Sequence, residues 1–119
     1  MRIMISELTG AALDWVVAKC EFPYASSEDI QVWVQPLPCD DETDFKFQPS
    51  TDWAQGGPII EREELSRLIC YNHNDWGCLN GEVFCEGPTP LIAAMRCYVA
   101  SKLCDQFTNE VDVPDELVK

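Results

Sequence analysis

The fold is constrained most strongly by an apolar stretch near the C-terminus, residues 86–105, which reads EGPTPLIAAMRCYVASKLCD. Thr89 is a suitable N-cap for a helix, and Pro90 suits the first helical position, where the missing N–H removes no helical hydrogen bond. No Gly or Pro follows Pro90 within the stretch. At about 100° per residue, its apolar side chains cover more than half of the helix circumference. The sequence therefore predicts a long helix that other parts of the chain enclose on most sides.

Arg96 projects from the middle of this apolar face, with Ile92 and Val99 about one turn away on either side. Burial of an unpaired guanidinium is costly, so Arg96 should form an ion pair with a carboxylate or extend its charged end into solvent. The alternative is a ligand-binding Arg, because the planar guanidinium is well suited to recognising anions.

The charge of the chain is strongly negative. It has 21 acidic and 8 basic side chains, a formal net charge of −13. This disfavours direct binding to nucleic acid or to an anionic membrane, which depends on Lys and Arg neutralising phosphates, and it favours a basic protein surface or a cation. No apolar run approaches the roughly 18 residues of a spanning helix, and the N-terminus lacks the features of a signal peptide. We therefore expect a cytoplasmic protein without membrane contact.

The seven cysteines are expected to be reduced in that compartment, and their odd number and irregular spacing do not indicate a disulfide framework. A Cys₃His zinc site could be formed by Cys70, His73, Cys78 and Cys85. These four residues lack the closely spaced Cys pair that is typical of structural zinc sites. Reduced cysteines around a surface His are therefore the favoured interpretation, and no cofactor is predicted.

The first half of the chain predicts a strand, a helix and a hairpin. Arg2 to Ile5 indicates a strand, and Ser6 is expected to cap an amphipathic helix that runs to about Cys20. Strict alternation predicts a strand over residues 30–35, paired with a return strand over residues 45–47. The turn between them is acidic. It could hold Ca²⁺, but it lacks the Gly of an EF-hand loop, so a solvated turn is favoured.

The second half contains more turn-forming residues. Residues 48–58 are expected to form a loop held by Trp53 packing into the core, and Pro58 could begin a short helix. Periodicity does not decide whether residues 65–71 are helix or strand. Residues 72–81, NHNDWGCLNG, indicate a turn, and residues 83–85 indicate a short strand.

These elements predict a single α+β domain over residues 1–119, in which two main helices pack on a small antiparallel sheet. An acidic, extended tail is expected from about residue 106, with Val111 and Val113 on the surface. No nucleophile with an adjacent base is apparent, and Gly56-Gly57-Pro58 lacks the spacing and the Lys of a phosphate-binding loop. An enzyme is therefore not expected.

Three blocks of the sequence carry a family resemblance: SELTGAALDWVVAK, PSTDWAQGGPIIERE, and GPTPLIAAMRCYVASKL followed by VDVPDEL. Together they resemble the NinX-like family of small proteins encoded by lambdoid phages and related prophages. The segment between Leu65 and Glu86 departs from the family pattern. The resemblance implies an accessory phage product, without an established activity, that works in the cytoplasm of the infected bacterium.

The second and third blocks suggest one concave site, provided that they meet in space. Its candidate ligand-binding residues are Thr51, Asp52, Trp53, Gly56, Gly57, Gly87, Thr89 and Arg96. The leading hypothesis is a non-catalytic protein that binds a host protein with a basic surface, with nucleic-acid mimicry or an anti-defence role as the purpose. The alternative is sequestration of a nucleotide-like signal, with the base stacked on an aromatic ring and the anion held by Arg and backbone amides. Self-association into a homo-oligomer is left open.

Overall fold

The computed structural model describes residues 2–34, 46–63, 67–80, 83–103 and 110–117. The helices of this described part are α1 (Gly10–Glu21), α2 (Ser27–Val34), α3 (Trp53–Arg62) and α4 (Pro90–Leu103), with short 3₁₀ turns η1 (Ile5–Glu7) and η2 (Asp115–Leu117). The strands are β1 (Arg2–Met4), β2 (Arg67–Asn72), β3 (Asp75–Asn80), β4 (Val83–Gly87) and β5 (Glu110–Asp112). The predicted α+β class is confirmed, although it contains more helices than the two main ones expected.

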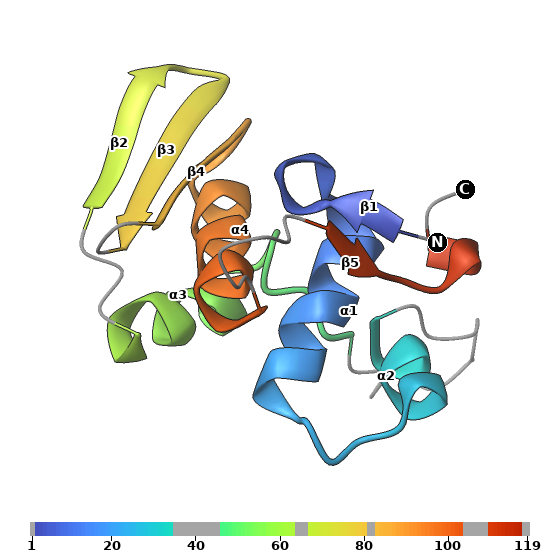
Figure 1. Ribbon diagram of the computed structural model, residues 1–119. Coiled ribbons are helices and arrows are strands. Elements are labelled where there is room, and N and C mark those ends of the chain that lie inside the picture. Colours follow the sequence, from blue (N-terminus) through green and yellow to red (C-terminus); the bar gives the residue numbers. More distant parts are fainter. Residues whose placement is uncertain (1, 35–45, 64–66, 81–82, 104–109, 118–119) are drawn as a thin grey trace.

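The strands form two separate antiparallel sheets. One has the order β2-β3-β4, and the other pairs β1 with β5 near the two ends of the chain. Figure 1 shows α4 between the three-stranded sheet and α1, so the molecule is layered as sheet, helix, helix. The core is therefore centred on α4.

Helix α4 confirms the prediction made from its sequence. Residues 91–100 are all buried, and the Thr89 hydroxyl accepts a hydrogen bond from the Ile92 N–H at 3.1 Å as the expected N-cap. Only the last turn, at Ser101 and Lys102, is exposed. None of the described helices is both long and apolar enough to cross a membrane.

The start of α1 differs from the prediction. Ser6 lies in η1, and the helix begins after Thr9 at Gly10, whose φ of 56° lies in the left-handed region that favours glycine. The predicted strand at the N-terminus is confirmed over Arg2–Met4, and the predicted end of the helix near Cys20 agrees with the observed end at Glu21.

The strand predicted over residues 30–35 is wrong, because residues 30–34 belong to helix α2, and residue 35 lies outside the described residues. The Ser26 hydroxyl caps the helix by accepting the Asp29 N–H at 3.1 Å. Ile30 and Val34, four residues apart, are fully buried, whereas Val32 between them is 55 % exposed. Apolar residues at every second position were thus compatible with a helix.

The predicted return strand is also wrong where the structure describes it. Lys46 and Phe47 are not in a strand, and the Phe47 N–H donates to the Trp33 carbonyl at 2.8 Å. Phe45 and the acidic turn at residues 40–44, with its weighed Ca²⁺ site, lie outside the described residues.

Residues 53–58, predicted as loop, form the first part of α3. Pro58 does not begin this helix but lies inside it. It is tolerated because Ala54, whose carbonyl it leaves without a helical donor, is on the exposed face, and because Gly57 has no Cβ to clash with the proline ring. Trp53 is exposed rather than packed into the core.

Part of the segment predicted as a turn over residues 72–81 is strand β3. The start of the segment does turn, where the Asn72 side chain accepts the Asn74 N–H at 3.1 Å. Residues 75–80 pair with β2 on one side and β4 on the other, and this pairing outweighs the turn-forming composition. Residues 67–71 of the undecided segment belong to strand β2, and the strand predicted at residues 83–85 is confirmed as part of β4.

The tail is extended over β5 as predicted, where Val111 pairs with Ile3 of β1. Val113 is buried, so its predicted place on the surface is wrong.

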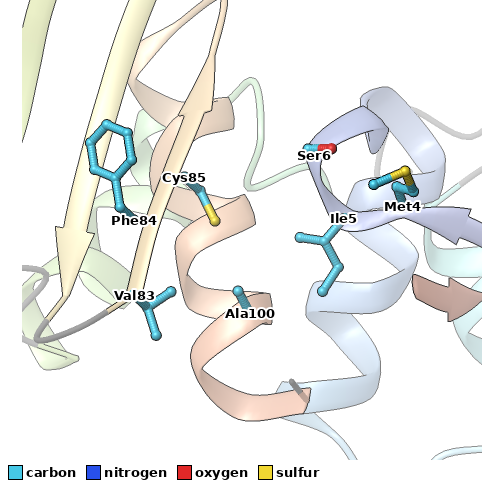
Figure 2. Close-up of a pocket in the computed structure, with 7 residues that line it drawn as sticks. All are labelled: Met4, Ile5, Ser6, Val83, Phe84, Cys85 and Ala100. Atoms are coloured by element: carbon cyan, nitrogen blue, oxygen red, sulfur yellow. The ribbon is translucent and has the colours of Figure 1, made fainter. Parts of the chain in front are cut away.

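A pocket of about 360 Å³ lies between the N-terminal segment and the three-stranded sheet. Met4 and the turn η1 line one side of it, and strand β4 lines the other (Figure 2).

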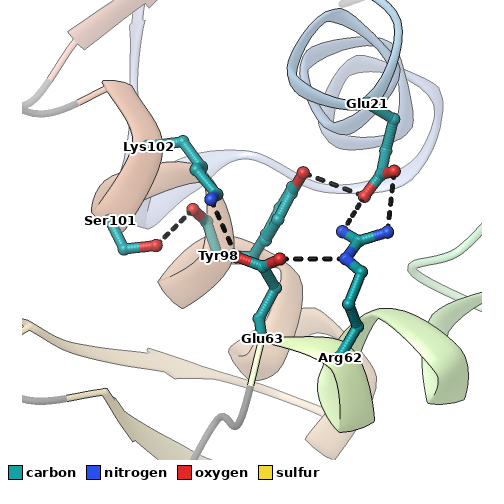
Figure 3. A network of polar contacts seen from close by, with 6 residues as sticks. All are labelled: Glu21, Arg62, Glu63, Tyr98, Ser101 and Lys102. Atoms are coloured by element: carbon teal, nitrogen blue, oxygen red, sulfur yellow. Dashed lines mark hydrogen bonds and ion pairs between the residues drawn. The ribbon is translucent and has the colours of Figure 1, made fainter.

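A polar network ties the C-terminal ends of α1, α3 and α4 together (Figure 3). The Arg62 guanidinium binds the Glu21 carboxylate through two nitrogens and also reaches Glu63 at 2.9 Å. Lys102 donates to Glu63 at 2.9 Å, and the Tyr98 hydroxyl donates to Glu21 at 2.9 Å. This network holds the C-terminal end of α3 against the C-terminal end of α4.

Candidate functional site

The starts of α3 and α4 meet and enclose a pocket of about 220 Å³. Its lining residues are Ser50, Thr51, Trp53, Thr89, Pro90, Leu91 and Ile92. The structure thus brings together Thr51, Trp53 and Thr89, which sequence analysis assigned to one concave site from two distant blocks. Trp53 stands at the rim with 54 % of its surface exposed, while Leu91 and Ile92 form an apolar floor.

The turn before α3 is held by two side chains of the helix start. Asp52 caps α3 by accepting the Ala54 N–H at 2.9 Å. The Gln55 side chain accepts the Gln48 N–H at 2.8 Å and donates to the Lys46 carbonyl at 2.9 Å and to Asp52 at 3.2 Å. Asp52, a predicted ligand-binding residue, therefore has a structural partner, and the wall of the pocket that carries Trp53 is fixed.

Gly56 and Gly87 have packing functions at this site. A Cβ on Gly56 would lie 2.4 Å from the Pro49 carbonyl oxygen and 2.7 Å from the Leu91 side chain. A Cβ on Gly87 would lie 2.8 Å from the Ala93 nitrogen. Both glycines thus allow close approach of main chains, and neither lines the pocket. Gly57, with no atom near its missing Cβ, is not a lining residue either.

A family model described as "Bacteriophage P22, NinX" matches residues 4–102. The match includes every residue that lines the pocket and extends from the start of η1 to the last turn of α4. The chain belongs to the NinX family. A search of curated proteins gives no match. The resemblance seen in the three sequence blocks is confirmed, and the protein is a phage accessory protein of the NinX type.

Behind the pocket of this NinX protein, Ser50 contacts a buried carboxylate that sequence analysis did not single out. Asp14 of α1 is almost fully buried and accepts the Ser50 N–H at 2.9 Å. The Ser50 hydroxyl lies close enough to favour the charged carboxylate, but within the described residues it has no partner at hydrogen-bond geometry. Burial dominates and raises the pKa of Asp14 from 3.8 to about 6, against the opposing effects of Ser50 and Lys46.

We expect the Asp14→Asn variant to be more stable than the wild type at pH 7.5, by about 2 kcal/mol. A pKa raised from 3.8 to about 6 means that the folded state holds its proton more tightly than the unfolded state. The contribution of Asp14 to stability is therefore greatest below pH 4, falls as the pH rises to 6, and is constant above that, with an upper limit of about 3 kcal/mol. Asn keeps the acceptor for Ser50 without the charge.

Urea denaturation of both proteins between pH 4 and pH 8 measures this difference. The Asp14→Ala variant is the control, because it removes the charge as well but leaves the Ser50 N–H without its acceptor, so it should be less stable than Asp14→Asn by about 1–3 kcal/mol. Wild type and Asp14→Asn variants that lose stability in parallel between pH 4 and pH 6 would contradict the assignment.

Arg96 lies outside the pocket of the NinX protein. The expectation that it forms an ion pair with a carboxylate or extends into solvent is wrong. Its exposed fraction is only 7 %, so it does not extend into solvent. The Arg96 Nε donates to the Leu8 carbonyl at 2.8 Å and Nη1 to the Glu86 carbonyl at 2.7 Å, so the described hydrogen bonds end on main-chain oxygens rather than on a carboxylate. Arg96 thus joins the end of η1 to the end of β4 across α4.

The four residues weighed as a zinc site are not gathered in this NinX structure. Cys70 and His73 are exposed at the far end of β2, whereas Cys78 is buried and Cys85 is partly buried against α4. Among the described residues, no three His, Cys, Asp or Glu side chains are arranged to hold a metal ion.

Sequence analysis did not assign the following residues to the site or its support: Ser50, Pro90, Leu91, Ile92 and Asp14. For Asp14 a signal was present, since it is an acidic residue within the apolar run of the predicted first helix of this NinX chain. The lining residues had no such signal, because only the three-dimensional contact between two helix starts selects them.

Proposed function

We propose that this NinX-family protein is a non-catalytic binding protein that acts in the cytoplasm of the infected bacterium by holding a host protein with a basic surface. The observation that carries the proposal is Trp53, a large apolar side chain that is more than half exposed at the rim of a preformed pocket. Trp is the residue most enriched among those that dominate binding energies at protein interfaces.

The charge of the chain supports a basic partner. A net charge of −13 on 119 residues attracts a positive surface over long range and accelerates its association. Host surfaces that bind nucleic acid are of this kind, so an acidic phage protein can occupy them in place of nucleic acid. This would give the protein an anti-defence role if the host protein belongs to a defence system.

The size and lining of the pocket support a protein partner over a small molecule. Its volume of about 220 Å³ lies below the roughly 300–1,000 Å³ of typical small-molecule sites. It is large enough for one apolar or aromatic side chain, and Pro90, Leu91 and Ile92 offer an apolar surface to it. The partner is therefore proposed to insert one such side chain beside Trp53.

A nucleotide-like ligand is the second candidate, and the same exposed Trp53 favours it. The polar groups at the pocket favour it less. The Asp52 carboxylate stands at the start of α3, where it repels an anion, and the Arg96 guanidinium is directed to main-chain carbonyls elsewhere. Thermal-shift measurements with nucleotides and signalling dinucleotides decide between the two, since a tight ligand raises stability by a few kcal/mol.

Replacement of Trp53 by Ser should weaken partner binding about 30-fold or more without changing the stability of the protein, because truncation of a central interface residue costs about 2 kcal/mol or more. The partner is first captured by a photocrosslinking phenylalanine analogue placed at position 53 in infected cells, then purified, and its affinity is measured by calorimetry. Tyr24→Ser is the matched control, since Tyr24 is 84 % exposed and lies outside the described pockets.

The proposal requires three results together: a crosslink at position 53 but not at position 24, a captured protein of net positive charge, and binding that weakens as salt is raised. A Trp53→Ser variant that binds the captured protein as tightly as the wild type would overturn it. So would stabilisation by a nucleotide that is lost in the same variant.

A further inference from the structure

Three thiols meet beneath α4, in a part of the molecule that the pocket at Trp53 does not include. Cys78 of β3 and Cys85 of β4 are directly opposite each other in the antiparallel register. Cys97 of α4 lies close to both strand cysteines, and its thiol donates to the Val83 carbonyl at 3.7 Å.

Cys85 is the member of this cluster that can be reached from outside. It lines the pocket of about 360 Å³ between η1 and β4, together with Ile5, Ser6 and Ala100 among others. Figure 2 shows its sulfur directed from β4 toward the side of the pocket on which Ile5 lies, whereas the Phe84 ring projects away from it. Cys78 and Cys97 are fully buried. A small reagent therefore meets Cys85 first.

The surroundings of Cys85 favour its anionic form. The nearby Cys97 thiol and the positive charge of Arg96 both lower the pKa of Cys85, against the opposing effect of burial. The two neighbouring strand cysteines and burial raise the pKa of Cys97, so its thiol stays protonated. Arg96, whose described hydrogen bonds end on carbonyl oxygens, thus has a group nearby that can balance its charge. A neighbouring Arg is one of the features that lower the pKa of a thiol and so make the cysteine reactive.

We propose that Cys85 is an oxidation site for small hydroperoxides, and that Cys78 resolves the product into a Cys78–Cys85 disulfide. The Cys85 thiolate attacks the terminal oxygen of the hydroperoxide. A sulfur–oxygen bond forms, the oxygen–oxygen bond breaks, and the alkoxide or hydroxide leaves and takes up a proton. The Cys78 sulfur then attacks the Cys85 sulfur and loses its proton, and the sulfenic oxygen leaves as water. Two thiols are oxidised by two electrons and one hydroperoxide is reduced.

The strand geometry suits this bond. Cα atoms of directly opposed residues in an antiparallel pair are about 4.5–5.5 Å apart, within the range of roughly 4.4–6.8 Å that disulfides span. The two strands are already paired, so the bond needs little main-chain movement. The inference is independent of the proposed host-protein binding, because it involves a different pocket and different residues.

The test uses the full-length reduced protein and hydrogen peroxide. Peptide mass spectrometry follows each cysteine with time, and the exposed Cys70 serves as the internal reference. The lowered pKa of Cys85 enlarges its thiolate fraction, and the lower nucleophilicity of a more stable thiolate offsets only part of this effect, so Cys85 should be consumed about threefold faster than Cys70 or more. The product should be a Cys78–Cys85 disulfide. Faster loss of Cys70, or a disulfide between other cysteines, would overturn the proposal.

A second measurement separates the two steps. In the Cys78→Ser variant the sulfenic acid on Cys85 should persist and be trapped by dimedone, whereas in the matched Cys70→Ser variant the disulfide should form at the wild-type rate. An unmodified Cys85 in the peroxide-treated Cys78→Ser variant, with its fold verified by circular dichroism, would also overturn it. The kinetics of the wild-type protein decide the matter if that variant does not fold.

Discussion

Replacement of Gly56 by Ala should lower the free energy of unfolding by about 3 kcal/mol or more. The added Cβ would lie 2.4 Å from the main-chain oxygen of Pro49, and a main-chain atom cannot turn aside as the end of a flexible side chain can. Either α3 or the preceding turn must move, and overpacking of this kind costs about 1–3 kcal/mol even where side chains can yield. Chemical denaturation of the purified variant measures the loss.

Gly57→Ala is the matched control in the same turn of the same helix. Apart from its two chain neighbours and the main chain of its own helix, no atom lies within 4 Å of the position of its Cβ. The gain of about 0.5–1 kcal/mol from replacing a helical Gly is offset by the contact that Ala would make with the ring of Pro58, so the net change should be less than about 1 kcal/mol. Equal losses in the two variants would show that Gly56 is needed for reasons other than its contact with Pro49.

Replacement of Arg96 by Ala should lower the free energy of unfolding by about 3–5 kcal/mol. The variant removes two charge-assisted hydrogen bonds and leaves the buried carbonyl of Leu8 and the partly buried carbonyl of Glu86 without these donors. Each such bond contributes about 1.5–3 kcal/mol. Because Arg96 connects η1 with β4, urea denaturation and hydrogen exchange at both elements should show the loss.

Arg2→Ala is the control for this variant. Arg2 is largely exposed, and its ion pairs with Glu110 and Asp112 at 3.9 and 3.6 Å lie on the surface, so its loss should cost less than about 1 kcal/mol. If Arg96→Ala cost no more than Arg2→Ala, the two carbonyls would have to find other donors, and Arg96 would not be a structural residue.

Local signals explain which elements could be predicted from the sequence. The cap at Thr89, Pro90 at the first position and the unbroken apolar run all lie within α4, so the helix was predicted with its correct start and its burial. Strand β3 had no such signal, since it depends on hydrogen bonds to β2 and β4. For α2, the choice between strand and helix depended on the cap at Ser26, which alternation of apolar residues does not reveal.

The residues of the candidate site also divide into those with a local sequence signal and those that only tertiary contacts bring together. Thr51, Trp53 and Thr89 were correctly placed near one another because each belongs to a distinctive block, although periodicity gave no sign that Trp53 would be exposed. The partner of Arg96 could not be predicted, because carbonyl oxygens are present at every residue and leave no mark in the sequence. The Asp14–Ser50 contact joins residues of α1 and the turn before α3, and only the assembled core brings them together.

The pairing of β1 with β5 has a mechanical consequence. Arg2 is opposite Asp112 and Met4 is opposite Glu110, so tension applied at residues 2 and 112 acts on the same end of the ladder. The hydrogen bonds then open one after another, as in a zipper, instead of sharing the load as in shear. A bacterial unfoldase that pulls on either terminus would peel this pair away with little force, and resistance to degradation must come from the layers packed around α4.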